Sequence, residues 1–207
     1  MKPSVTFVRI PKNASTSIYD ALGDHNTIRE DKLIDFFHKK KTRYKGIFSP
    51  SHCLFSEATE ELGSSLLDVP SFAVTRNPYD RLVSMFFFAK KNNLISLYLK
   101  GKVDFLDFCR FFSHEKEENI DFFHGFTQIS YVTLEDKIGV NKILRFENLD
   151  NDFKNFILEY NLDSLTPALP RKNSTEHDSY KQYYCSESKK IVEKIWKEDL
   201  DEFKYSF

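Results

Sequence analysis

A short run of β-branched and aromatic residues near the amino terminus leads directly into a polar loop and then into a helical segment. The run covers residues 5–10, the loop covers residues 11–17, and the helical pattern ends at Gly23. A buried strand that turns into a helix through small and hydroxyl-bearing residues directs the backbone N–H groups of the turn toward one point, where an anion can bind. This segment therefore favours an α/β sheet that binds an anion at one edge.

The alternation of strands and helices continues along the chain. Strand patterns cover residues 46–49, 71–75 and 142–146, and helical patterns begin at Asn77-Pro78 and cover parts of 92–118, 150–160 and 186–203. Such alternation predicts a central parallel sheet flanked by helices, a P-loop-like three-layer α/β sandwich. Because the 207 residues contain no repeat, low-complexity tract or linker, we expect one domain over residues 1–207.

Composition excludes several classes of protein. The chain has 30 basic and 31 acidic residues, whereas a nucleic-acid-binding protein usually has a basic excess. It has no apolar stretch of the roughly 20 residues that span a bilayer and no signal sequence, so we expect a cytoplasmic protein without a membrane span. The three cysteines lie far apart and the histidines lack ligand spacing, so we expect reduced thiols and no metal site.

The loop after the first strand carries the chemistry of a phosphate site. Lys12 supplies a positive charge, and Ser15, Thr16 and Ser17 supply hydroxyl donors where the helix begins. The pattern differs from the usual P-loop G-x-x-x-x-G-K-[ST], since both glycines are absent and the lysine precedes the small residues. Taken alone, the loop also fits a capped helix that follows a strand and carries a surface lysine.

A second basic element follows the strand at 71–75. Arg76 stands at its carboxyl end, Asn77-Pro78 fits an N-cap followed by the first helical position, and Ser84 falls on the helical stripe of Asn77. An arginine with a hydroxyl suits a phosphate monoester. In an open α/β sheet this element and the loop at 11–17 meet outside the carboxyl ends of the strands.

These motifs closely resemble those of sulfotransferases that use 3′-phosphoadenosine-5′-phosphosulfate (PAPS), nearest to the carbohydrate, Golgi-type branch. Residues 7–17 are similar to the 5′-phosphosulfate loop, commonly I-P-K-T-[AG]-[GS]-T-[ST], and residues 72–84 to the 3′-phosphate element R-[DN]-P-x-x-R-x-x-S. Residues 144–149 match R-[YF]-E-[DN]-L, and segments 169–173 and 196–205 resemble the family's tail. The resemblance spans most of the chain in the family's order.

The resemblance implies a role for each matching position. Lys12 would stabilise the oxygen between the donor's phosphate and its sulfur as that bond breaks, and Arg76 with Ser84 would hold the 3′-phosphate. Asn13 stands where threonine is frequent, and the absence of glycine puts the conformation of the loop in question. The positions expected to bind the two phosphates of the donor are Lys12, Asn13, Ala14, Ser15, Thr16, Ser17, Arg76, Ser84, Arg171 and Lys172.

Transfer to a hydroxyl also needs a base, and His52 is the residue we expect to supply it. It follows the strand pattern at 46–49 and so belongs to the carboxyl edge of the sheet, where the family places a catalytic histidine. A histidine that only caps the loop is the structural alternative, and His124 is the reserve candidate for the base.

The sequence thus predicts in-line transfer of a sulfuryl group from PAPS to a hydroxyl acceptor, with PAP and a sulfate ester as products. The acceptor that we expect is a carbohydrate, and a lipid or a small alcohol is the alternative. The alternatives are a P-loop-type nucleotide kinase, which would need Mg²⁺ and ATP, and a non-catalytic nucleotide-binding protein.

Overall fold

The computed structural model describes residues 4–29, 31–33, 44–45, 52–97, 99–117, 121–122, 127–165, 169 and 178–207. Within it the chain forms two compact units. The first comprises Met1–Lys41, Ser49–Arg76 and Gln128–Ser174, and the second comprises Thr42–Phe48, Asn77–Thr127 and Thr175–Phe207. The single domain predicted over residues 1–207 stays a prediction.

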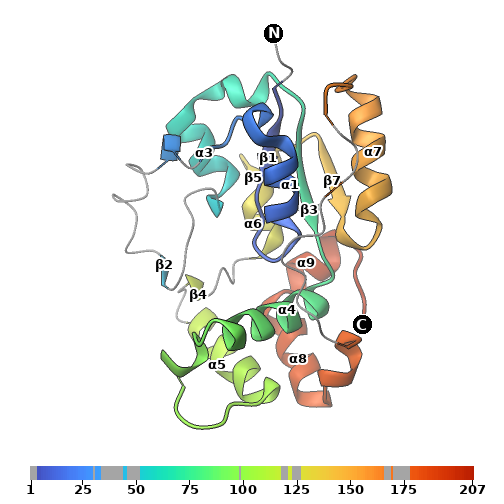
Figure 1. Ribbon diagram of the computed structural model, residues 1–207. Coiled ribbons are helices and arrows are strands. Elements are labelled where there is room, and N and C mark those ends of the chain that lie inside the picture. Colours follow the sequence, from blue (N-terminus) through green and yellow to red (C-terminus); the bar gives the residue numbers. More distant parts are fainter. Residues whose placement is uncertain are drawn as a thin grey trace. The chain divides into compact units, whose positions relative to one another are not determined.

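The first unit is built on a parallel sheet with strand order β1-β3-β7 (Figure 1). The strands are β1 (Thr6–Val8), β3 (Ser71–Thr75) and β7 (Lys142–Arg145), with Phe7 opposite Phe72 and Thr75 opposite Arg145. Parallel neighbours need long crossover connections, and helices lie in both of the connections between these strands. The helices of this unit include α1 (Ser15–Leu22), α3 (Phe55–Leu62), α6 (Gln128–Val132) and, after the last strand, α7 (Leu149–Glu159).

Phenylalanine fills the core of this unit. The rings of Phe7 and Phe72 stack with centroids 4.8 Å apart, and Phe156 from α7 lies 4.6 Å from Phe72. Ile18 and Leu22 of α1 pack into the same cluster, so α1 and α7 cover one face of the sheet. Alternate strand residues point to the opposite face. There Thr6 Oγ1 donates a hydrogen bond of 2.9 Å to the Leu66 carbonyl in the 3₁₀ turn η4 (Ser64–Leu67).

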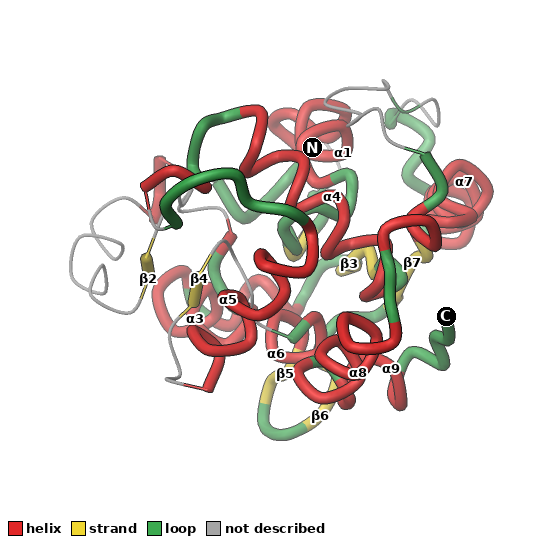
Figure 2. Tube along the Cα trace, turned by 90° about the horizontal axis from the view of Figure 1, so that it is seen from below, coloured by secondary structure: helices red, strands yellow, loops and turns green. Residues whose placement is uncertain are grey.

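The second unit is mainly helical. It holds α4 (Pro78–Lys91), η5 (Ile95–Leu97), α5 (Phe105–Glu117), η7 (Tyr180–Tyr183), α8 (Ser186–Ile195) and α9 (Lys197–Glu202), with β2 (Tyr44–Lys45) paired to β4 (Asp121–Phe122). In the view from below, α8 and α9 lie next to each other (Figure 2). Trp196 lies fully buried in the core of this unit, with its ring 5.4 Å from that of Phe112.

The structure confirms the central parallel sheet with flanking helices and the strand at 71–75. The predicted strand at 5–10 is shorter, Thr6–Val8, because Arg9 and Ile10 already lead into the loop. The single helix predicted over 186–203 is wrong: Trp196, with φ −125° and ψ 33°, separates α8 from α9. The strand predicted at 46–49 lies outside the described residues.

Candidate active site

The loop between β1 and α1 adopts left-handed backbone conformations at two residues that are not glycine. Lys12 has φ 70°, and Ala14, the N-cap of α1, has φ 56° and ψ 20°. The alanine side chain cannot cap the helix, and the Ile18 N–H donates a backbone hydrogen bond of 3.3 Å to the Ala14 carbonyl. The N–H groups at the start of a helix have no acceptor within it. The loop therefore has the backbone geometry of an anion-binding nest at a helix N-terminus.

Asn13 anchors this loop to the protein interior. Its side chain is 1% exposed, and Nδ2 donates to the Val74 carbonyl at 2.7 Å and to Gln128 Oε1 at 2.6 Å. Both amide hydrogens are thus used inside the protein. Asn13 can contribute to a phosphate site through its backbone N–H, whereas its side chain fixes the loop against the carboxyl end of β3.

Arg76 joins the same loop from the end of β3. Its Nη1 donates to the Lys12 carbonyl at 3.0 Å, and its guanidinium carbon lies 4.1 Å from the centroid of the Phe146 ring. A guanidinium carries five N–H donors, so the bond to the Lys12 carbonyl is compatible with a second role toward a phosphate. The structure therefore brings Lys12 and Arg76 together at the carboxyl edge of the sheet, as the sequence predicts.

Lys12 is electrostatically disfavoured in the free protein. Burial, and then the nearby positive charge of Arg76, lower the pKa of Lys12 from 10.5 to about 8. A cation that is held in a desolvated position beside another cation gains the most when an anion binds. This corner of the sheet is consequently prepared for a ligand with negative charge.

His52 is held at the same end of β1. The imidazole is 8% exposed, and its Nδ1 lies 2.7 Å from the carbonyl oxygen of Arg9, the residue after β1. A carbonyl oxygen only accepts hydrogen bonds, so Nδ1 carries the hydrogen and Nε2 of the neutral ring carries the lone pair. This contact sets the tautomer that a general base requires, with Nε2 as the proton acceptor.

Comparison with known protein families identifies the family of this chain. Residues 2–206 match the family model described as "Sulfotransferase family". The chain belongs to the sulfotransferase family.

The crystal structure of a sulfotransferase from Alicyclobacillus acidocaldarius is similar to the whole of this sulfotransferase. The TM-score is 0.50 at 11% sequence identity, and the match covers 100% of this chain and 98% of the other. At that identity the likeness shows the fold, a P-loop-like sandwich with a central parallel sheet. No curated protein matches the sequence.

The remaining predicted residues of the sulfotransferase are placed as follows. Ser84 lies on α4 in the second unit and is 3% exposed. Asn77 caps that helix, since its side chain accepts a hydrogen bond of 3.0 Å from the Tyr79 N–H, and Pro78 is the first helical residue, as predicted. The positions that lie outside the described residues are His124, Arg171 and Lys172.

Two residues of the site were not identified from the sequence. Gln128, at the start of α6, is fully buried and bonds to the backbone of Arg76 and to Asn13. Phe146 was noted only as part of a strand-end motif, yet its ring lies under the Arg76 guanidinium. The position of Phe146 directly after a strand, in R-F-E-N-L, could have suggested that its ring contacts the site. Nothing in the sequence around Gln128 marks it as a residue of the site.

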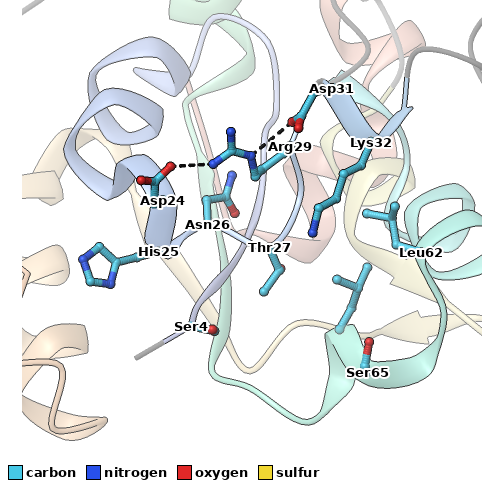
Figure 3. Close-up of a pocket in the computed structure, with 11 residues that line it drawn as sticks. Ser4, Asp24, His25, Asn26, Thr27, Arg29, Asp31, Lys32, Leu62 and Ser65 are labelled. Atoms are coloured by element: carbon cyan, nitrogen blue, oxygen red, sulfur yellow. Dashed lines mark hydrogen bonds and ion pairs between the residues drawn. The ribbon is translucent and has the colours of Figure 1, made fainter. Parts of the chain in front are cut away.

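A separate hollow of about 520 Å³ lies at the opposite end of the sheet, beside the residues that precede β1 and β3 (Figure 3). Its lining includes Arg29, whose guanidinium forms ion pairs with Asp24 and with Asp31. Two carboxylates already neutralise this arginine, so the hollow lacks the excess positive charge that Lys12 and Arg76 give to the carboxyl edge. We therefore place the candidate site at the carboxyl edge.

The part of the chain that the structure describes contains no group of three or more His, Cys, Asp or Glu side chains that could hold a metal ion. None of its helices is long and apolar enough to cross a membrane. Its cysteines are free thiols, and burial raises the pKa of the Cys53 thiol beside His52 to about 12. That thiol is therefore no nucleophile at neutral pH.

Proposed function

We propose that this sulfotransferase moves a sulfuryl group from PAPS to a hydroxyl group, giving PAP and a sulfate ester, and that the acceptor is a carbohydrate. The observation that supports the proposal is that Lys12, Arg76 and the nest before α1 lie together at one edge of the sheet. His52 is held at the same edge by its contact with the Arg9 carbonyl, directly after β1. The carbohydrate acceptor rests on the resemblance of the loop and of the 3′-phosphate motif to the carbohydrate branch.

Each part of the proposed site has one task. The N–H groups at the start of α1 and the hydroxyls of Ser15, Thr16 and Ser17 bind the 5′-phosphate, and Arg76 binds the 3′-phosphate. The part proposed for Ser84 in binding the 3′-phosphate rests on the sequence motif, as do those of Arg171 and Lys172. Binding a nucleotide that carries two anionic groups offsets the repulsion between Lys12 and Arg76.

The transfer itself needs a base on one side of the sulfur and a positive charge on the other. His52 Nε2 takes the proton of the attacking hydroxyl as its oxygen forms a bond to sulfur. The bond between sulfur and the 5′-phosphate oxygen breaks in line, and the electron pair stays on that oxygen. Lys12 stabilises the charge that develops there, an interaction that is stronger in the transition state than in the ground state.

The test is transfer of ³⁵S from labelled PAPS to a panel of carbohydrates and small alcohols. We expect the wild-type protein to label at least one carbohydrate and the Lys12→Ala, His52→Ala double variant to label none. Undiminished transfer by the double variant would refute the mechanism. Calorimetry with PAP and with Mg-ATP separates the alternatives, because a kinase would bind Mg-ATP and not PAP, and a non-catalytic protein would bind PAP without turnover on any acceptor.

A further inference from the structure

Gln128 uses both polar atoms of its side-chain amide to connect two segments of the candidate site. Its Oε1 accepts hydrogen bonds from Asn13 Nδ2 at 2.6 Å and from the Arg76 N–H at 2.9 Å. Its Nε2 donates to the Arg76 carbonyl at 2.8 Å. One fully buried side chain thus binds both backbone polar groups of Arg76 and, at the same time, the anchor of the loop.

This set of bonds defines the backbone of Arg76 where the strand has already ended. β3 stops at Thr75, so the N–H and carbonyl of Arg76 no longer belong to the sheet ladder. Buried backbone groups need hydrogen-bond partners. The Gln128 amide supplies them, since it accepts from the N–H and donates to the carbonyl as a residue of a neighbouring strand would. The direction in which the Arg76 side chain leaves the sheet is therefore set by Gln128, which is 52 residues away in the sequence.

The same amide also controls the loop. Asn13 reaches Gln128 with one hydrogen of Nδ2 and the Val74 carbonyl with the other. Arg76 completes this hydrogen-bond network, because its Nη1 donates to the carbonyl of Lys12, the neighbour of Asn13. The loop and Arg76 are thus held to each other twice, once through side chains in the interior and once through the guanidinium.

We propose that Gln128 is a positioning residue of this sulfotransferase, which fixes the Lys12–Asn13 segment and Arg76 in the relative placement needed to hold the two phosphates of one nucleotide. The inference rests on the function proposed above. Gln128 touches neither the nucleotide nor the reacting atoms in this scheme. It acts because a binding group displaced by about 1 Å can lower the rate of a reaction by about 10²-fold.

The experiment compares Gln128→Met with a matched control, Asn26→Leu. Methionine keeps the length of the side chain but makes none of the three bonds. Asn26 is also buried in the first unit, and its amide also makes three bonds, to Phe7 N–H, Ile28 N–H and the Ile28 carbonyl, at the amino end of β1. Both variants lose a comparable set of buried hydrogen bonds, but only one loses them at the candidate site.

Three measurements are made on each protein: the urea midpoint, kcat and KM for PAPS, and the pKa of Lys12 by NMR of the labelled lysine in the free protein. We expect both variants to lose stability, but only Gln128→Met to lower kcat/KM by about 10²-fold and to move the pKa of Lys12 back toward its ordinary value. If Gln128→Met does not fold, Asn13→Ala cuts the loop half of the same network and leaves the Arg76 bonds to Gln128 in place.

Two results would overturn the proposal. In the first, Gln128→Met is destabilised but keeps the wild-type kcat/KM and the wild-type pKa of Lys12. In the second, Asn26→Leu loses as much kcat/KM as Gln128→Met does. If the wild-type protein neither binds PAP nor uses PAPS, the proposed function fails by itself. The Lys12 measurement on the free protein still decides whether Gln128 positions the loop, since it needs no nucleotide.

Discussion

Replacing Lys12 by methionine should make the free protein more stable at neutral pH, although it removes a proposed catalytic group. Burial and the charge of Arg76 lower the pKa of Lys12 from 10.5 to about 8. Each pKa unit corresponds to about 1.4 kcal/mol, so the charged lysine costs the folded state about 3 kcal/mol. Methionine keeps most of the aliphatic stem without the charge. For a chain of this size, the gain corresponds to a rise in Tm of roughly 6–12 °C.

The stability gained by Lys12→Met should decrease as pH rises. Between pH 8 and 10.5 the unfolded chain keeps the proton of Lys12 while the folded protein loses it, so wild-type stability rises with pH in that window. The cost is fully present below about pH 8 and disappears above the unfolded pKa. The advantage of Lys12→Met should therefore fall from about 3 kcal/mol at pH 7 to under about 1 kcal/mol at pH 10.

The assay is urea denaturation followed by circular dichroism at both pH values, without nucleotide. Lys154→Met is the matched control, because Lys154 is an exposed residue of α7 in the same unit and should show no such gain. A Lys12→Met protein no more stable than the wild type at pH 7 would refute the reasoning. So would an advantage that stays the same at pH 10, since a gain from hydrophobic packing does not titrate.

Three further predictions concern nucleotide binding, catalysis and the loop backbone. PAP binding at pH 8.5 should be accompanied by uptake of a proton, because a bound phosphate raises the depressed pKa of Lys12. Calorimetry in buffers of different ionisation enthalpy measures this uptake, which should not occur in Lys12→Met. The affinity of the wild-type protein for PAP should fall as pH rises beyond about 8. His52→Gln should lower kcat by about 10²–10⁴-fold in ³⁵S transfer while PAP affinity in the same preparation is unchanged, since it removes the base and not a phosphate ligand. Ala14→Gly should leave Tm unchanged or raise it, whereas Ala14→Val should lower the free energy of unfolding by about 1–2 kcal/mol, because a branched side chain is strained at a φ of 56°. Equal Tm values for the two variants would contradict this prediction.

The elements that carry strong local signals could be predicted from the sequence. The polar loop before a helix that ends at Gly23, the β-branched run at 71–75 and the Asn77-Pro78 helix start all appear in the structure near their predicted places. Their order places Lys12 and Arg76 at one edge, because parallel strands of a sheet share their carboxyl end. His52 also lies at this edge, with Nδ1 2.7 Å from the Arg9 carbonyl, although the strand at 46–49 from which its place was predicted lies outside the described residues.

The features that depend on distant partners could not be predicted. The helical pattern runs through Trp196 without interruption, but its ring packs against Phe112 and the backbone leaves the helical region there. Gln128 lies 115 residues from Asn13 and has no recognisable motif around it. The tautomer of His52 follows from one contact with the Arg9 carbonyl. Each is set by tertiary packing, which local propensity does not record.

The loop of this protein adopts left-handed backbone without the glycines that a P-loop has. Glycine serves there because left-handed backbone costs it little, whereas for other residues each such position costs about 1–2 kcal/mol. Lys12 and Ala14 occupy two such positions. The loop is therefore held from outside, by the bonds of Asn13 to Val74 and Gln128 and by that of Arg76 to Lys12. Strain of this kind persists only where surrounding contacts over-determine it, and the cation pair adds to it until an anion binds. The proposed nucleotide would remove the electrostatic part of this cost and leave the backbone part, so we expect the interior bonds to hold the loop in the free and the bound protein alike.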